Sequence, residues 1–478
     1  MFNTLRSWWQ DKLLRGVLKN TGYLFSSNTI SAALGMVNSI FATRLLGIEG
    51  LGLVTTVQTF TSNINRLLSF RMSEVVVKHL GQAMASDQHD DGETVQPAGT
   101  SLGQVTTNQK AAAIVKGIGL IEAATSILAY LILVLLAPWA AQVFLKDPSL
   151  AALFPIYGLM LLANLIYETS VGVLQTYKRF SWLGIINTIQ SIITASLILL
   201  AFVFNRSLLD VLAAYLVGKS FAGISVAILA FRQMNQDFGS HWWYSSLGAV
   251  NNWRGILGFA VNTNLNGTVN LVTRDNAPLY LAALSPADVS QAYVGYFKLG
   301  LSIINLITLP IDPFIWPTYA EITRTIALRQ WQKTRDLLKR VSTIAGLWTL
   351  AAGAGIALFG WWLIPFVYGP TTLPVYPVVL ILLVGYGTAN TLNWNRPLLL
   401  ALGKPSYPLW VAIGIGAVEI LLVLLLVPSG GYLAMAAILS AYLAVSVGII
   451  AWRGWRLMRE YETKDPVPAE PELGDTSS

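Results

Sequence analysis

Residues 255–284 read GILGFAVNTNLNGTVNLVTRDNAPLYLAAL, a segment long enough to cross a bilayer as a helix but unusually rich in polar side chains. Four of these side chains recur at every fourth position: Asn262, Asn266, Asn270 and Arg274. On a helix, such positions form one slowly drifting stripe. Polar side chains inside a bilayer are costly unless they face a bundle interior or a wet cavity, so the stripe predicts a helix that borders a solvated pathway.

The next segment, residues 289–319, repeats this pattern. Lys298, Asn305 and Asp312 are spaced seven residues apart and would share one helix face. Two adjacent helices with polar stripes, each carrying a basic residue, indicate a buried and solvated pathway, because intramembrane charges are usually functional. Hydrogen bonding between helices for packing alone is the alternative. Asp275, which follows Arg274, would point elsewhere on a helix.

The composition is that of a membrane protein. Of the 478 residues, 54% are hydrophobic and only 12% are charged, about half the charged fraction of a soluble domain. The chain has no cysteine and three histidines, which excludes cysteine chemistry and argues against a histidine-based triad or metal cluster. We therefore expect no cofactor. The net charge is +7, but the basic residues lie between hydrophobic runs and form no nucleic-acid patch.

Twelve segments have about the length that a bilayer requires. We expect an all-α polytopic membrane protein with about 12 transmembrane helices, at residues 22–46, 51–77, 111–137, 152–177, 180–204, 208–231, 255–284, 289–319, 341–367, 374–401, 406–427 and 431–452. With the N-terminus in the cytoplasm, 21 of the 31 Lys and Arg residues lie in inside segments, 2 lie outside and 8 lie within spans. This asymmetry follows the positive-inside rule and predicts that both termini are cytoplasmic.

Polar stretches divide the chain into two halves of six spans. We expect an interfacial amphipathic helix at residues 1–20, an N-terminal lobe at 21–232 with a disordered cytoplasmic insert at 82–109, a linker at 233–254, a C-terminal lobe at 255–452 and a cytoplasmic tail at 453–478. Short similarities between the halves, such as Ala42-Thr43-Arg44 and Val272-Thr273-Arg274, favour a duplicated transporter.

Three short motifs resemble those of a known family. Residues 44–52, RLLGIEGLG, resemble the first loop of the polysaccharide and oligosaccharide flippases of the multidrug/oligosaccharidyl-lipid/polysaccharide (MOP) exporter superfamily. Ser285 with Val294-Gly295-Tyr296, and the sequence YKRF at residues 177–180, are similar to later points of the same family. The chain departs from the family at residues 53–54, where Leu and Val replace a frequent aromatic residue, and in the length of the insert at 82–109.

The resemblance implies a MATE-like fold, with two six-helix lobes around a central cavity lined by spans one, two, seven and eight. It implies a transporter, not an enzyme. Its cargo would be a lipid-pyrophosphate-linked oligosaccharide, such as an O-antigen, capsule or exopolysaccharide repeat unit, moved from the inner to the outer leaflet by alternating access. The implied location is the cell inner (plasma) membrane. The implied partners are this cargo, membrane lipids and the polysaccharide polymerase or export machinery.

Fixed cations would hold a pyrophosphate strongly in a low-dielectric cavity, and amides would bind sugars. The candidate cargo ligands are Arg66, Arg274, Lys298, Arg44, Arg71, Arg396, Asn262, Asn266, Asn270 and Asn305. Ion pairing and snorkelling to the membrane surface are the structural alternatives. Three acids, Asp312, Glu168 and Glu419, are candidates for coupling transport to H⁺ or Na⁺, although lone acids in apolar segments also serve as hydrogen-bonded packing groups.

Three other functions remain open. A cation-coupled multidrug exporter of the same fold would favour an acidic binding lobe, whereas spans one, two, seven and eight hold five basic residues against Glu74, Asp275 and Asp312. A flippase for a lipid-linked peptidoglycan precursor is the second. The third, a membrane glycan polymerase or ligase, needs acid and base residues gathered on the outer face. The predicted outer loops are short, and their ionisable residues are scattered.

Overall fold

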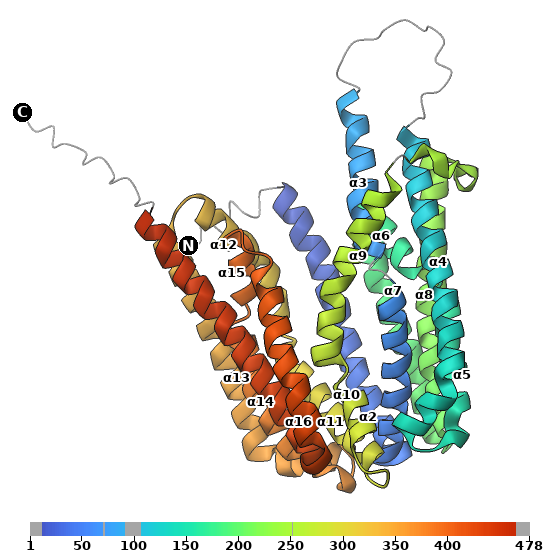
Figure 1. Ribbon diagram of the computed structural model, residues 1–478, viewed down its shortest axis with the longest axis vertical. Coiled ribbons are helices and arrows are strands. Elements are labelled where there is room, and N and C mark those ends of the chain that lie inside the picture. The colour runs from blue at the N-terminus through green and yellow to red at the C-terminus, as the bar shows by residue number, and fades with distance from the viewer. Residues whose placement is uncertain (1–11, 70–71, 91–106, 251, 465–478) are drawn as a thin grey trace, which may run out of the picture.

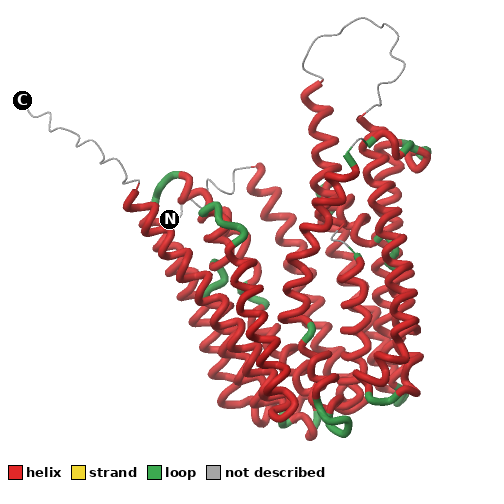
Figure 2. The backbone as a smooth tube through the Cα atoms, in the orientation of Figure 1, coloured by secondary structure: helices red, strands yellow, loops and turns green. Residues whose placement is uncertain are grey.

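The computed structural model describes residues 12–69, 72–90, 107–250 and 252–464, and within these ranges the chain forms helices and no strands (Figures 1 and 2). The first half contains α2 (Lys12–Leu68), α3 (Met72–Asp90), α4 (Thr107–Ala140), η1 (Ala141–Leu145), η2 (Pro148–Ala152), α5 (Leu153–Ala163), α6 (Tyr167–Thr176), α7 (Phe180–Val203) and α8 (Leu208–Phe238). The label η marks a 3₁₀- or π-helix. The all-α prediction is confirmed.

The linker and the second half continue the helical chain. They contain η3 (Trp242–Tyr244), η4 (Leu247–Ala249), α9 (Trp253–Asn270), η5 (Leu271–Asp275), α10 (Ala277–Leu284), α11 (Ser290–Thr308), η6 (Asp312–Phe314), α12 (Ile315–Ala327), α13 (Trp331–Tyr368), η7 (Pro370–Thr372), α14 (Val375–Thr391), α15 (Asn395–Ala401) and α16 (Tyr407–Lys464).

Two of the helices are too long to be straight membrane spans. A straight helix of 57 residues, the length of α2, would measure about 85 Å, far more than the ~30 Å hydrocarbon core. The chain turns within α2 at Gly47 (φ 71°) and within α16 at Gly431 (φ 56°). Glycine tolerates this left-handed backbone because it has no Cβ. Each of these long helices therefore consists of two spans.

The predicted number of spans is consistent with these elements. Among the described residues, 8 helical stretches are long and apolar enough to cross a membrane, or 9 if the bent pair α11 and α12 is one span. Two of the stretches contain the glycine turns, and the polar segment α9–α10 is not among the eight. Counting two passes for each glycine-containing stretch and one for α9–α10 gives twelve.

The helices form two groups that converge at one end of the molecule and diverge at the other (Figure 1). Following the predicted division, we call α2 to α8 the N-terminal lobe and α9 to α16 the C-terminal lobe. The last turns of α3 and α16 and the first turn of α4 lie at the diverging end, which we call the open end. The converging end is called the closed end. Large apolar side chains on the flanks, such as Leu350 on α13 at 71% exposure, form a surface suited to lipid.

At the closed end, the two lobes touch through their main chains. A Cβ atom on Gly52 of α2 would lie 1.9 Å from the carbonyl oxygen of Gln291 in α11, and one on Gly295 would lie 2.1 Å from the carbonyl oxygen of Ile48. Only glycine permits such close approach. The side chain of Gln291 also accepts a hydrogen bond from Thr56 Oγ1 (3.2 Å). The segments that carry the family resemblance thus pack against each other.

Two cations of the N-terminal lobe strengthen the closed end. Arg44 donates to the carbonyl oxygens of Val367 (Nε, 2.8 Å) and Phe366 (Nη2, 2.6 Å), in the last turn of α13. Lys146 Nζ donates to the carbonyl oxygen of Ala283 (2.9 Å), at the end of α10. Unpaired carbonyls and the helix dipole make a helix C-terminus favourable for cations. Both contacts cross from one lobe to the other.

The predicted domain boundaries differ from the helix boundaries at several points. Helix α3 continues to Asp90 and α4 begins at Thr107, so helix covers both ends of the predicted disordered insert. Residues 91–106 and 1–11 lie outside the described residues, and residues 12–20 belong to α2. The predicted linker packs on the N-terminal lobe, where Trp242 is buried and Lys116 Nζ donates to the carbonyl oxygen of Ser245 (3.1 Å).

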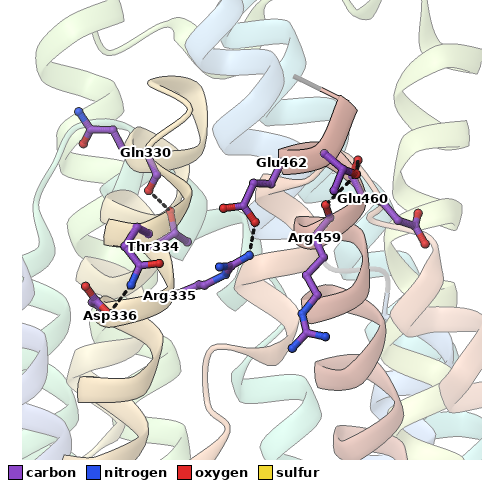
Figure 3. A network of polar contacts seen from close by, with 9 residues as sticks. Gln330, Thr334, Arg335, Asp336, Arg459, Glu460 and Glu462 are labelled. Carbon is purple, nitrogen blue, oxygen red and sulfur yellow. Dashed lines mark hydrogen bonds and ion pairs between the residues drawn. The ribbon is translucent and has the colours of Figure 1, made fainter. Parts of the chain in front are cut away.

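The first part of the predicted tail is ordered and helical. Helix α16 extends to Lys464, and near its end Glu462 accepts a hydrogen bond from Arg335 at the start of α13 (Figure 3). Trp331, Leu338, Leu457 and Met458 form a buried cluster between the same two helices. Residues 453–464 of the predicted tail therefore pack against the start of α13 at the open end, and residues 465–478 lie outside the described residues.

Candidate functional site

A cavity of about 320 Å³ lies where α2, η5 and α11 meet. We call it the basic cavity because its lining includes three cations, Arg66, Arg274 and Lys298, and one carboxylate, Asp275. The remaining polar lining consists of hydroxyl and amide groups, from Thr55, Gln58, Thr59, Ser62, Asn63, Asn305 and Tyr386. Three fixed cations against one carboxylate suit the binding of an anion.

A second cavity of about 530 Å³ lies between α2, α3 and α6 of the N-terminal lobe and α9. We call it the amide cavity because most of its polar lining is amide and hydroxyl, from Asn65, Ser69, Ser73, Tyr167, Gln175, Asn264 and Asn270. Glu74 and Glu168 also line it. Both volumes are within the range that encloses small-molecule ligands, roughly 300–1,000 Å³.

The two cavities share Arg66 and Asp275, which form an ion pair between the lobes. Arg66 Nη1 on α2 lies 2.5 Å from Asp275 Oδ2 on η5, and Arg274 Nε lies 3.8 Å from Asp275 Oδ1. One turn earlier on α2, Asn63 Nδ2 donates to Asn276 Oδ1 (2.6 Å). A charged contact therefore joins α2 to η5, and a neutral contact joins α2 to the residue that follows η5.

The π-helix η5 explains why Asp275 faces the cavities. On an α-helix, adjacent residues point about 100° apart, and Asp275 was expected to point away from the stripe that ends at Arg274. The wider π-turn over Leu271–Asp275 changes the phase, so Arg274 and Asp275 both face the N-terminal lobe. That expectation is wrong. Such π-bulges are frequent at functional sites.

The polar stripe predicted for residues 262–274 is divided between the two cavities. Asn270 lines the amide cavity, whereas Arg274, four residues later, lines the basic cavity. Asn262 and Asn266 lie on α9, and their side chains are outside the described set. Asn264, which the stripe does not include, lines the amide cavity.

The stripe on α11 holds over seven residues. Lys298 and Asn305 both line the basic cavity, as their spacing predicts. Asp312 begins η6, at the break where α11 and α12 are bent by 50°, and it is not part of the lining of either cavity. The proline-containing break therefore separates Asp312 from its predicted face.

Two predicted cations, Arg44 and Arg396, line neither cavity, and a third cannot be placed. Arg44 lies at the closed end, bonded to the last turn of α13. Arg396 is exposed on α15 and lines neither cavity. Arg71 lies outside the described residues.

The intramembrane acids differ in their surroundings. Glu168 lines the amide cavity and accepts a hydrogen bond from Ser73 Oγ (2.5 Å). Glu122, buried in α4, accepts from the backbone N–H groups of Glu168 (2.8 Å) and Thr169 (2.7 Å), and so caps the start of α6. Glu419 is 4% exposed, and neither of its carboxylate oxygens has a hydrogen-bond partner within the described part of the chain.

Several cavity residues were missed by the sequence analysis, although a signal for some of them exists. Thr55, Thr59, Ser62 and Arg66 follow helical spacing along α2 and form one polar face. Hydroxyl groups are common in transmembrane helices for packing, which hides such a face. Within the described ranges, no group of three or more His, Asp or Glu residues could hold a metal ion.

Comparisons with known proteins agree with this architecture. The model of the polysaccharide biosynthesis protein family matches residues 17–322, almost two thirds of the chain. The inner membrane protein YghQ of Escherichia coli (strain K12) is 21% identical over 380 residues, which cover 78% of this chain and 99% of that protein.

Two solved structures show the same fold. One is the inward-facing conformation of a multidrug resistance MATE family transporter of the MOP superfamily, with a TM-score of 0.67 and 13% identity, covering 91% of this chain and 96% of that one. The other is the lipid II flippase MurJ in an inward closed conformation, with a TM-score of 0.62 and 14% identity, covering 93% of each chain.

The fold and the family together confirm the predicted class of protein. This is a multi-pass membrane protein, and it has the fold of that MATE transporter and of MurJ. The chain belongs to the polysaccharide biosynthesis protein family.

Proposed function

We propose that this protein flips a lipid-pyrophosphate-linked oligosaccharide from the inner to the outer leaflet of the inner membrane. The observation that carries the proposal is the basic cavity, where Arg66, Arg274 and Lys298 face a single carboxylate. A pyrophosphate cannot cross a ~30 Å hydrocarbon layer unaided, because charge in hydrocarbon is costly. Fixed cations would replace its hydration shell, while the lipid tail stays in the bilayer.

The amide cavity supports the sugar part of the proposal. Asn65, Asn264, Asn270 and Gln175 supply donors and acceptors, and Ser73 and Glu168 add further polar groups. Because the two cavities share residues, one cargo molecule would place its pyrophosphate in one cavity and its first sugars in the other.

Alternating access would move the cargo between the two leaflets. The positive-inside asymmetry and the likeness to an inward-facing transporter support placing the open end in the cytoplasm. Single cysteines at two exposed positions, Ser240 after the end of α8 and Lys333 in the first turn of α13, should resist an impermeant thiol reagent in intact cells. The chain has no native cysteine to interfere. Labelling of either position from outside would reverse the orientation.

Glu419 is our proposed coupling residue for H⁺ or Na⁺. A buried carboxylate without a hydrogen-bond partner among the described residues must either bind a proton or meet a cation. Glu168 and Asp312 are the other two candidates, but Glu168 already accepts a hydrogen bond from Ser73 and Asp312 is exposed, whereas Glu419 is buried. Glu419→Gln should abolish the dependence of transport on an imposed ion gradient. Unchanged dependence would assign Glu419 to packing.

The central test is surface glycan display in a flippase-deficient host. Arg66→Ala, Arg274→Ala and Lys298→Ala should each abolish display while leaving the expression level normal. Lys333→Ala, which removes an exposed cation from α13, is the matched control and should display normally. Normal display from all three cavity variants would refute the proposal. Rescue of a host that lacks its peptidoglycan precursor flippase would instead identify that precursor as the cargo.

A further inference from the structure

The ion pair that separates the two cavities has a feature that the cargo-binding proposal leaves unexplained. Asp275 lies in a cavity lined by three cations, where a carboxylate weakens the attraction for any anionic ligand. It contacts Arg66 of the other lobe at 2.5 Å and approaches Arg274 at 3.8 Å. In the absence of cargo, Asp275 therefore neutralises part of the charge that would bind it.

The groups of this ion pair are accessible from the cavities. The side chains of Arg66, Arg274 and Asp275 are 58%, 52% and 36% exposed. Exposed ion pairs contribute little to stability, because water and other ions compete for each partner. A pyrophosphate offers several charged oxygens and could bind both guanidinium groups in bidentate fashion, which a single carboxylate cannot do.

The contact is also one of the links between the lobes. Arg66 belongs to α2 and Asp275 to η5, so an anion that takes the place of Asp275 on Arg66 removes a direct contact between the lobes. The neighbouring hydrogen bond from Asn63 joins α2 to Asn276, the residue that follows η5, without charge. Ligand binding to the cations therefore changes the attachment of the lobes at this level.

We propose that Asp275 is an internal counterion which the pyrophosphate of the cargo replaces, and that this exchange releases one lobe from the other. This rests on the proposed function. The pair between Arg66 and Asp275 is one of the contacts that join the lobes of the empty transporter, and its loss shifts the loaded transporter towards reorientation. The exchange couples cargo binding to reorientation and reduces movement of the empty protein. Asp275 is thus a positioning residue that acts through the cations, not a ligand of the cargo.

The first test measures binding of inorganic pyrophosphate to the purified full-length protein by calorimetry. Asp275→Asn keeps the size of the side chain and removes its charge, so we expect about tenfold tighter binding than in the wild type, because a competing anion has been lost. Asn276→Ala removes the neutral contact between the lobes and should leave the affinity unchanged. Equal affinity for pyrophosphate in the wild type and in Asp275→Asn would show that Asp275 does not compete with the ligand for the cations.

The second test measures the distance between the lobes by electron spin resonance. Spin labels on cysteines at Gln236 of α8 and Lys333 of α13, both exposed, report on the open end. Pyrophosphate should shift the distance distribution of the wild type, and Asp275→Asn should be shifted already without ligand. A distribution that stays the same in both proteins would refute the release of the lobes.

The outcomes separate this inference from the proposed function. If the wild type binds no pyrophosphate, the basic cavity does not bind the cargo as proposed. The replacement of Asp275 by pyrophosphate is then wrong as well. If the wild type binds pyrophosphate and displays glycan, but Asp275→Asn matches it in affinity and lobe distance, the flippase proposal stands and only the counterion exchange is wrong.

Discussion

The closed end and the cavities are both places where the two lobes meet, but they meet through different chemistry. At the closed end, Gly52 and Gly295 bring main chain against main chain, with no room for a side chain. At the cavities, contact depends on Arg66, Asp275 and polar side chains that face open space. The first contact depends on shape and the second on charge. Volume changes should therefore matter at one end and charge changes at the other.

The largest expected effect is a change of volume at the closed end. Gly52→Ala places a methyl group 1.9 Å from the carbonyl oxygen of Gln291, so the lobes must separate there. Overpacking of this kind costs about 1–3 kcal/mol. We expect a lower Tm in detergent and loss of glycan display. Gly35→Ala, on the same helix with nothing within 4 Å, is the control and should behave as wild type. Equal Tm values for both variants would show that the main-chain contact at Gly52 does not stabilise the protein.

A change of charge geometry in the basic cavity should have a smaller effect. Arg274→Lys keeps the positive charge but loses the planar, bidentate guanidinium, so partial flipping should remain where Arg274→Ala has none. We expect a roughly tenfold loss in the initial rate of glycan display, with an unchanged Tm. Full activity of Arg274→Lys would show that charge alone is sufficient. A lowered Tm would show that Arg274 is required for packing.

Arg44 brings a charge to the closed end, where the other contacts between the lobes depend on shape. Its guanidinium group donates hydrogen bonds to two backbone carbonyl oxygens there. A cation at a helix C-terminus contributes about 0.3–1 kcal/mol. Arg44→Ala should therefore shift the equilibrium towards opening at this end by a factor of about two to five. The measurement is labelling of a cysteine at Thr59, in the basic cavity, by an impermeant reagent outside intact cells. Unchanged labelling would mean that the contact does not stabilise closure.

The smallest effect is expected from residues 91–106, whose polar, Gly- and Asp-containing composition cannot bury a core. Deleting them and joining the flanking helices with a short Gly-Ser linker should leave the expression level and glycan display near normal. Loss of folded protein after this deletion would show that the segment packs against the transporter.

The periodicity of the sequence predicted the helices and the polar face of α11 that lines the basic cavity. It did not predict which side of the helix the side chains of η5 occupy. Lys298 and Asn305 fall on one face because α11 is regular over that length. Arg274 and Asp275 could not be placed in this way, because the π-turn of η5 has no distinct sequence signature. A pattern read at 3.6 residues per turn assigns Asp275 to the wrong side.

The partners of the other charges depend on tertiary contacts that no local pattern contains. Arg44 was a cavity candidate as a cation within a predicted span, yet it lies beside the end of α13, more than 300 positions later in the chain. Glu122 caps the start of α6, a helix that the sequence gives no reason to place beside it. The glycines of residues 44–52 were read as a family motif, and their physical reason became clear only with α11 in contact.

The main-chain contact at the closed end has an electrical consequence. Once filled with water, the cavities would carry the potential of the open side into the protein, so that most of the membrane voltage would fall across the layer where Gly52 and Gly295 pack. Each elementary charge that crosses this layer exchanges about 2.3 kcal/mol with a potential of 100 mV. An inside-negative membrane would drive an anionic headgroup outward. Flipping in proteoliposomes should then accelerate under an imposed inside-negative potential, and the membrane voltage itself would be a source of energy for export.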